Sequence, residues 1–175
     1  MLILKIFGIT LIIMSSTGIG FALGNNMKQR LEELKELKKL FGMLMGEIKY
    51  AGTPLYEAFG IIGRRSRGIY AAFFLQTAKA LEALNGKSLP SIWEELKAEE
   101  FLKESRLSEK DWDRLLRFGE NLGYLDKNMQ LGTIELYLEN LESELKEGTA
   151  DYLKNSRLCR CLGVSGGLLI TILLL

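Results

Sequence analysis

The 175-residue sequence contains no histidine, only two cysteines and only two prolines. Without histidine it has no Ser-His-Asp or Cys-His nucleophile pair, no imidazole metal ligand and no side chain that ordinarily titrates near neutral pH. Cys159 and Cys161 are separated by one residue, so a disulfide between them would not close a long loop. The net charge is only +1, which gives no basic excess to attract nucleic acid.

Charged side chains are almost absent from both ends of the chain. Residues 1–25 contain one charged side chain, Lys5, and residues 162–175 contain none. The middle carries nearly all of the 23 basic and 22 acidic residues, in almost equal numbers. This distribution is unlike that of a soluble globular protein and predicts a charged domain between two apolar segments.

The N-terminal segment, residues 1–24, has the length and composition of a membrane-spanning helix. Its first 23 residues would extend roughly 34 Å as a helix, enough for the ~30 Å hydrocarbon core. Ser16, Gly20 and Gly24 recur every fourth residue and predict a face for close helix packing. A cleaved signal peptide, with Lys5 as its basic region, is the alternative.

The C-terminal segment, residues 158–175, predicts a second span. Its 18 residues would extend about 27 Å, with Arg160 reaching toward the headgroups. Gly163 and Gly167 give it a small-residue face of its own. The alternative is an apolar tail packed on the domain, although such a tail would offer no polar face to water.

Basic residues predict the orientation of these spans. They cluster just inside the two apolar segments, at Lys28, Arg30, Lys35, Lys38 and Lys39 and again at Lys146, Lys154, Arg157 and Arg160. The positive-inside rule then places residues 25–157 in the cytoplasm as one domain. We therefore expect a two-pass protein of the cell membrane.

The domain pattern is helical throughout. In residues 27–50, apolar side chains recur in steps of three and four, which is typical of one helix face; they are Met27, Leu31, Leu34, Leu37, Phe41, Leu44 and Ile48. Further helices are predicted near residues 54–65, 69–84, 89–104, 108–122 and 126–157, the last continuing into the second span. Thr53, Ser88, Ser108 and Asp126 are the expected helix caps. The sequence predicts an all-α, antiparallel bundle of about six helices between two transmembrane helices.

No set of residues predicts catalysis, a cofactor site or a metal site. Cys159 and Cys161 lack partners to complete a zinc site, although juxtamembrane cysteines can be acylated or can cross-link two chains. The simpler interpretation is two small side chains at a membrane boundary. A run of glutamates at Glu94, Glu95, Glu99 and Glu100 is typical of a solvated helix face.

Several spaced motifs together resemble one known family. They comprise Glu47, Ile48 and Tyr50 before Thr53, Pro54, Leu55, Glu57 and Ala58; Leu107, Ser108 and Asp111; Phe118, Gly119, Leu122, Gly123, Asp126 and Gln130; and the run RLCRCLG-x-x-GGL at residues 157–168. With the N-terminal span, this arrangement is similar to the stage III sporulation protein AB family of endospore-forming bacteria. The family usually has an aromatic residue and a serine where Cys159 and Cys161 stand, which argues against a special role for these cysteines.

The resemblance implies a function that composition alone does not. Members resemble the cytoplasmic domain of the type II secretion and type IV pilus platform protein, a six-helix bundle without catalytic activity. The expected role is a non-enzymatic platform in a secretion-like complex of the mother-cell membrane around the forespore. Expected partners are the membrane, a secretion-type ATPase of the stage III AA type and other proteins of the complex, with no nucleic acid and no small-molecule substrate. The long amphipathic helices also suit association with a further helix, including one from a second copy of the chain.

Two questions stay open at the level of the sequence. Gly119, Gly123, Asp126 and Gln130 lie around the junction of the last two domain helices, where a partner could bind. Alternatively, the glycines relax a turn and Asp126 caps a helix. The alternative function is a membrane-anchored helical-bundle receptor or scaffold unrelated to secretion.

Overall fold

The computed structural model describes residues 25–83, 86–97, 105–122 and 126–174, and residues 155–174 by their backbone alone. Its contacts divide the chain into two compact units. The first consists of Met1–Leu31 and Lys146–Leu175, and the second of Glu32–Leu145. We describe the two units separately.

In the first unit, the N-terminal helix packs directly against the last helix. Leu31 is buried, and its Cδ2 atom lies 2.8 Å from the position that a Cβ atom on Gly148 would occupy. Gly148 therefore leaves room for the end of the Leu31 side chain between the two helices.

The second unit begins with the continuation of the N-terminal helix, which is helical over residues 25–46 and ends in the wider π-helical turn η1 (Glu47–Ala51). The predicted stripe is confirmed, because its members from Leu31 to Ile48 are all buried. Gly52 ends the helix with a left-handed φ of 67°, and its N–H donates to the Glu47 carbonyl. Glycine suits this position because other residues rarely adopt that conformation.

Helix α2 (Leu55–Arg65) begins one residue later than the sequence suggests. Thr53 was expected to be its cap, but Pro54 occupies the cap position and accepts from the Ala58 N–H at 2.9 Å through its carbonyl. The Thr53 hydroxyl instead donates to Glu47, which also forms a 2.9 Å salt bridge with Arg65. Thr53 therefore ties the turn back to η1, and the predicted cap is wrong.

Helix α3 (Ile69–Glu82) lies close against α2. A Cβ atom on Gly63 would meet the Leu75 Cγ at 2.7 Å and the Leu75 backbone nitrogen at 2.8 Å. This contact explains a glycine within α2, because any side chain would force the two helices apart.

Two shorter helices follow, α4 (Leu89–Leu96) and α6 (Glu109–Leu122), and both begin at predicted caps. Ser88 accepts from the Ser91 N–H at 3.4 Å. Ser108 and Asp111 form a capping box, in which the Ser108 N–H donates to Asp111 at 2.8 Å and the Asp111 N–H donates to the Ser108 hydroxyl at 3.3 Å. Of the predicted helix 89–104, residues 98–104 lie outside the described residues.

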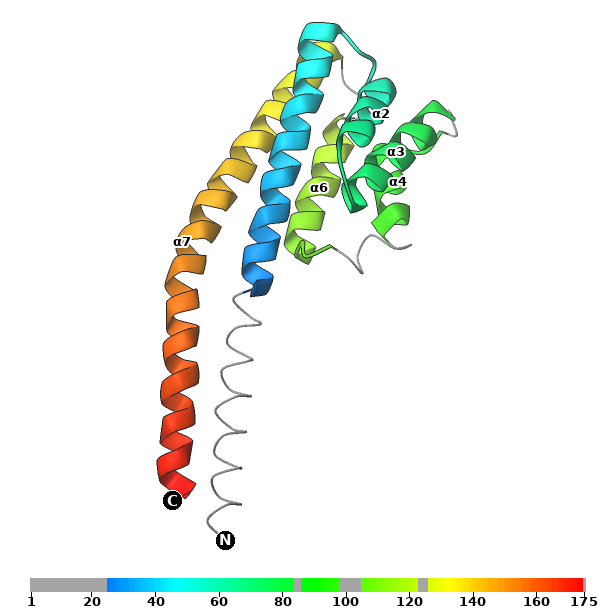
Figure 1. Cartoon of the computed structure of the whole chain (residues 1–175). Coiled ribbons are helices and arrows are strands. Elements are labelled where there is room, and N and C mark those ends of the chain that lie inside the picture. Colours follow the sequence, from blue (N-terminus) through cyan, green and yellow to red (C-terminus); the bar gives the residue numbers. More distant parts are fainter. Residues whose placement is uncertain (1–24, 84–85, 98–104, 123–125, 175) are drawn as a thin grey trace. The chain divides into compact units, whose positions relative to one another are not determined.

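Helix α7 (Lys127–Leu174) is continuous across the predicted domain boundary at residue 157. Within the second unit it runs antiparallel to the N-terminal helix, as Figure 1 shows for its yellow part beside the cyan helix. A 3.3 Å salt bridge joins Lys38 to Glu142, and Arg114 of α6 forms a further ion pair with Glu144.

An aromatic cluster fills the core of this unit. Phe41 makes edge-to-face contacts with Phe74 of α3, Phe118 of α6 and Tyr137 of α7, with ring centroids 5.0 to 5.7 Å apart. Such geometry adds to the stabilisation by burial. One ring thus joins four helices that are distant in sequence.

The described part of the chain is all-helical and contains no strand, which confirms the all-α part of the predicted fold class. The first expected span, residues 1–24, lies outside the described residues, and the second is described only as α7 backbone through Leu174. Over the residues that the structure describes, no helix combines the length and the apolar character of a membrane span.

Candidate interaction surface

The junction between α6 and α7 contains two of the residues expected to contact a partner. The Asp126 carboxylate accepts from the backbone N–H groups of Asn128 at 2.9 Å and Met129 at 3.0 Å, so the predicted cap is confirmed. The Gln130 side chain donates to the carbonyl of Leu122, the last residue of α6, at 3.4 Å. Both side chains therefore shape the junction, and Asp126 remains exposed to solvent.

Gly119 lies elsewhere, in the core. It is buried, and a Cβ atom on it would lie 2.8 Å from Cζ3 and 3.0 Å from Cε3 of Trp93. Its role in the structure is to admit the indole ring, while Gly123 lies outside the described residues. Contact of Gly119, Gly123, Asp126 and Gln130 with a partner stays a prediction.

Trp93 is held by a buried hydrogen-bond chain. Its Nε1 donates to the Thr77 hydroxyl at 3.1 Å, and this hydroxyl donates to the Phe73 carbonyl at 2.8 Å. Both Trp93 and Thr77 are fully buried. Because every polar atom in this chain has a partner, the indole is fixed in one orientation against Gly119.

Glu33 joins the N-terminal helix to two other parts of the unit. Its carboxylate accepts from the Tyr70 hydroxyl at 3.1 Å, the Ser105 hydroxyl at 2.8 Å and the Arg106 backbone N–H at 2.8 Å. Hydrogen bonds to a charged group are stronger than neutral ones. Glu33 therefore fixes the segment that leads into α6.

Two buried tyrosines are kept in their neutral form. Burial raises the pKa of Tyr70, and the adjacent Glu33 carboxylate raises it further. Burial also raises the pKa of Tyr137, to which the negative charge of Asp111 adds. Neither phenol is placed to exchange a proton near neutral pH.

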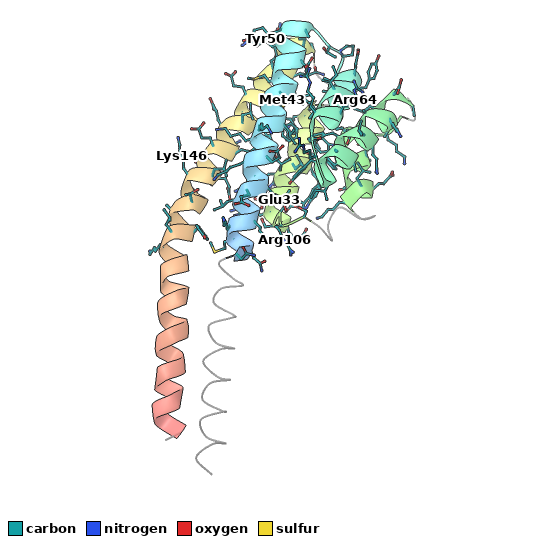
Figure 2. All side chains as sticks on the ribbon, in the orientation of Figure 1. Glu33, Met43, Tyr50, Arg64, Arg106 and Lys146 are labelled. Atoms are coloured by element: carbon teal, nitrogen blue, oxygen red, sulfur yellow. The ribbon has the colours of Figure 1, made fainter. Side chains whose placement is uncertain are left out.

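Exposed aromatic and apolar side chains gather at one end of the unit. Tyr50 in η1 is 83% exposed, Tyr56 in the first turn of α2 is 42% exposed, and Met129 in the first turn of α7 is 56% exposed. Lys127 Nζ lies 3.9 Å from the position of a Cβ atom on Gly52, so the start of α7 is next to the turn that follows η1. Helix α2 begins three residues after Gly52. Figure 2 shows Tyr50 at this end and Glu33 and Arg106 toward the other.

We call this end the tip surface and define it by Tyr50, Tyr56, Asp126, Lys127 and Met129. Of these five residues, the sequence predicts only Asp126 as a possible partner contact. The one signal in the sequence is that Tyr50 falls outside the apolar stripe of its helix. The grouping of the three turns depends on the tertiary fold.

The remaining predicted positions lie in the terminal segments. Ser16, Gly20 and Gly24 lie outside the described residues. Gly163 and Gly167 belong to the backbone of α7, and the side chains of Cys159 and Cys161 are not described. No group of three or more potential metal ligands occurs among the residues that the structure describes.

The described residues form an all-helical bundle in which the N-terminal helix and the first part of α7 run antiparallel (Figure 1). The particular family follows from comparison. The sequence model of stage III sporulation protein AB matches residues 5–175, and the chain belongs to this family. The family implies a role in sporulation.

Individual relatives agree with this assignment. A curated protein of Bacillus subtilis (strain 168), stage III sporulation protein AB, is 27% identical over 179 residues, covering 98% of this chain and 99% of the relative. A solved structure of stage III sporulation protein AB superposes with a TM-score of 0.61 at 24% identity, covering 71% of this chain and 97% of that one. This structural likeness shows the fold.

Proposed function

We propose that the chain is a non-enzymatic platform component of a secretion-like complex required for endospore formation. Its two apolar ends would anchor it in the mother-cell membrane facing the forespore, and its helical bundle would lie in the cytoplasm. There the bundle would dock a secretion-type ATPase of the stage III AA type. Family membership supports the setting, and the tip surface is the observation that carries the docking role.

The position of the tip surface suits this role. The N-terminal helix ends at η1 and α7 begins at Lys127, so along the chain a long helix separates the tip surface from each segment expected to span the membrane. In a two-pass protein, the tip surface would therefore be distant in sequence from both anchors.

The chemistry of the tip surface also suits protein binding. Tyrosine and methionine are common at the centres of protein interfaces, because they provide large contact areas with adaptable edges. Lys49 Nζ lies 5.6 Å from the centre of the Tyr50 ring, so a cation already stacks on the most exposed aromatic residue. The surface therefore offers an apolar centre with a charged edge.

Co-purification tests the docking role. The full-length chain in mild detergent should retain the ATPase in at least one nucleotide state. Changing Tyr50 and Met129 together to serine should weaken binding by about tenfold or more, because central contacts carry most of the affinity. Leu136→Ser is the matched control, since Leu136 is 60% exposed on α7 away from the first turn and its loss should leave binding unchanged.

The outcomes separate the parts of the proposal. Failure of the parent chain to bind in any nucleotide state would remove the ATPase as a partner. Equal binding by the tip variant and the parent would move the docking site elsewhere. Protease protection in intact cells tests the orientation, because digestion of the bundle from outside would place it on the opposite side of the membrane.

A further inference from the structure

Two charged stripes run along neighbouring helix faces in the second unit. The lysine stripe follows the N-terminal helix in steps of four, three and four residues through Lys35, Lys39, Gly42 and Gly46. The glutamate stripe follows α7 in steps of three, four and three through Gly132, Glu135, Glu139 and Glu142. These spacings place each set on one face of its helix. Lys38, next to Lys39 in sequence but outside the lysine stripe, forms a 3.3 Å salt bridge with Glu142 of the glutamate stripe, so the two helices lie side by side at this level.

Both stripes face solvent. Lys35, Lys39, Glu135 and Glu139 are exposed, as are Gly132 and Glu142, while Gly42 and Gly46 are half-buried. Lys39 forms a 3.3 Å salt bridge with Glu36 of its own helix, and both side chains of this pair are accessible to solvent. The surface therefore has a positive column beside a negative column, and most of its charge is available to another molecule.

The three glycines of the stripes make no close packing contact with the described part of the chain. A Cβ atom on Gly42, Gly46 or Gly132 would meet nothing within 4 Å. Gly63 and Gly119 differ, because a Cβ atom on either would collide with a buried neighbour. Glycine within a helix is unfavourable relative to alanine, so three open glycines on one surface conflict with helix stability alone. A flat surface does allow another backbone to approach closely.

We propose that a second copy of this chain docks on this surface, about a two-fold axis parallel to the two helices. Rotation about such an axis lays the lysine stripe of each copy over the glutamate stripe of the other. A two-fold axis across the helices would instead place lysine on lysine. The charge pattern thus selects one self-complementary arrangement, as a closed dimer requires.

This arrangement also directs both copies the same way. A two-fold axis along the helices leaves the chain ends of both copies at the same end of the dimer. Two chains anchored in one membrane must meet this condition, so this argument for the axis rests on the proposed membrane attachment. The charge complementarity of the stripes does not depend on it.

The helix register identifies the central contact. Lys38 lies opposite Glu142 within one chain. Lys39 is one residue and Glu139 three residues nearer the tip surface, so at about 1.5 Å per residue their levels differ by about 3 Å. In the dimer, Lys39 of each copy therefore lies over Glu139 of the other, and symmetry forms this pair twice. Reversing one of these charges creates two repulsive contacts, whereas reversing both restores two attractive ones.

Sedimentation equilibrium of the full-length chain in density-matched detergent tests the proposal. The parent should form a dimer. Lys39→Glu and Glu139→Lys should each raise the dimer dissociation constant by at least about tenfold, because each places like charges opposite one another. The Lys39→Glu/Glu139→Lys double variant should return to within about threefold of the parent, as should a mixture of the two single variants. Lys79→Glu, an exposed reversal on α3, is the control and should leave the dimer unchanged.

A second variant separates docking from folding. Gly42→Leu adds a side chain where the chain has open space, so its thermal unfolding should match or exceed that of the parent while its dimer weakens. The proposal is overturned by a parent that stays monomeric at all concentrations, by a dimer that Lys39→Glu does not weaken, or by a double variant that does not recover. The assay contains no ATPase, so its result is independent of the docking role proposed above.

Discussion

Gly119 and Gly42 form a matched pair of helical glycines with opposite surroundings. A Cβ atom on Gly119 would lie 2.8 Å from a ring carbon of Trp93, whereas one on Gly42 would meet nothing within 4 Å. Trp93 has little freedom to move, because it is fully buried and its Nε1 is bound to Thr77. Alanine at the two positions should therefore change stability in opposite directions.

The expected magnitudes follow from two effects. Carbon atoms in contact lie about 3.5–4.0 Å apart, so the Cβ atom of an alanine at position 119 would lie roughly 1 Å too close to the Trp93 ring. Overpacking of this kind costs about 3 kcal/mol at the upper end of the usual range. Alanine recovers about 1 kcal/mol through its higher helix propensity. Gly119→Ala should therefore lower the free energy of unfolding by about 2 kcal/mol. Gly42→Ala has the gain in helix propensity without the overpacking, so it should raise the free energy of unfolding by up to about 1 kcal/mol.

Urea unfolding of the full-length chain, followed by tryptophan fluorescence, measures both changes. The only two tryptophans, Trp93 and Trp112, are both buried in the helical unit, so the signal reports this unit directly. The two variants should differ by about 3 kcal/mol. A Gly119→Ala variant as stable as the parent would refute the close contact with Trp93. A Gly42→Ala variant that is destabilised at concentrations where the chain is monomeric would refute the open space at that position.

Three further predictions concern caps, charge and pH. Asp126→Ala should lower the free energy of unfolding by about 1 kcal/mol in a urea titration; unchanged stability with lost ATPase binding would instead make Asp126 a partner contact. Glu33→Gln should cost about 1–2 kcal/mol by the same measurement, because the charge-assisted bond from Tyr70 weakens, and an unchanged midpoint would show that Glu33 does not anchor its neighbours. The pKa values of Tyr70 and Tyr137 are raised above the ordinary value of about 10, so their neutral forms stabilise the fold fully below that pH. Stability should fall as the pH rises above about 10, and absorbance at tyrosinate wavelengths should show both groups ionising only on unfolding; early ionisation in the folded protein would contradict their burial.

The sequence predicts the helices well because local chemistry determines them. Ser88, Ser108 and Asp126 all act as the expected caps, since each needs only the backbone of the next turn. Thr53 fails as a cap because its hydroxyl has a competing partner in Glu47, across a turn whose shape depends on η1. The π-helical turn itself has no pattern of its own in the sequence.

The candidate surfaces are harder to predict because they depend on contacts between distant residues. Gly119 has the same local sequence whether it is a contact residue or a packing residue, and only the position of Trp93 on α4 distinguishes the two. The tip surface likewise combines Tyr50, Tyr56 and Met129 from three turns that no local pattern connects. The charge of the two stripes is visible in the sequence, but their adjacency follows from the Lys38–Glu142 bridge.

Site-specific photo-cross-linking in sporulating cells tests the central claim most directly. A photoreactive amino acid at position 50 should cross-link to the secretion-type ATPase, because Tyr50 is the most exposed aromatic residue of the tip surface. The same amino acid at position 136, on an exposed part of α7 beyond the tip surface, is the control and should not form this product. Cross-linking to the ATPase from position 50 alone is the result that the proposed platform role predicts. Absence of the product at position 50, or equal amounts from both positions, would contradict docking at the tip.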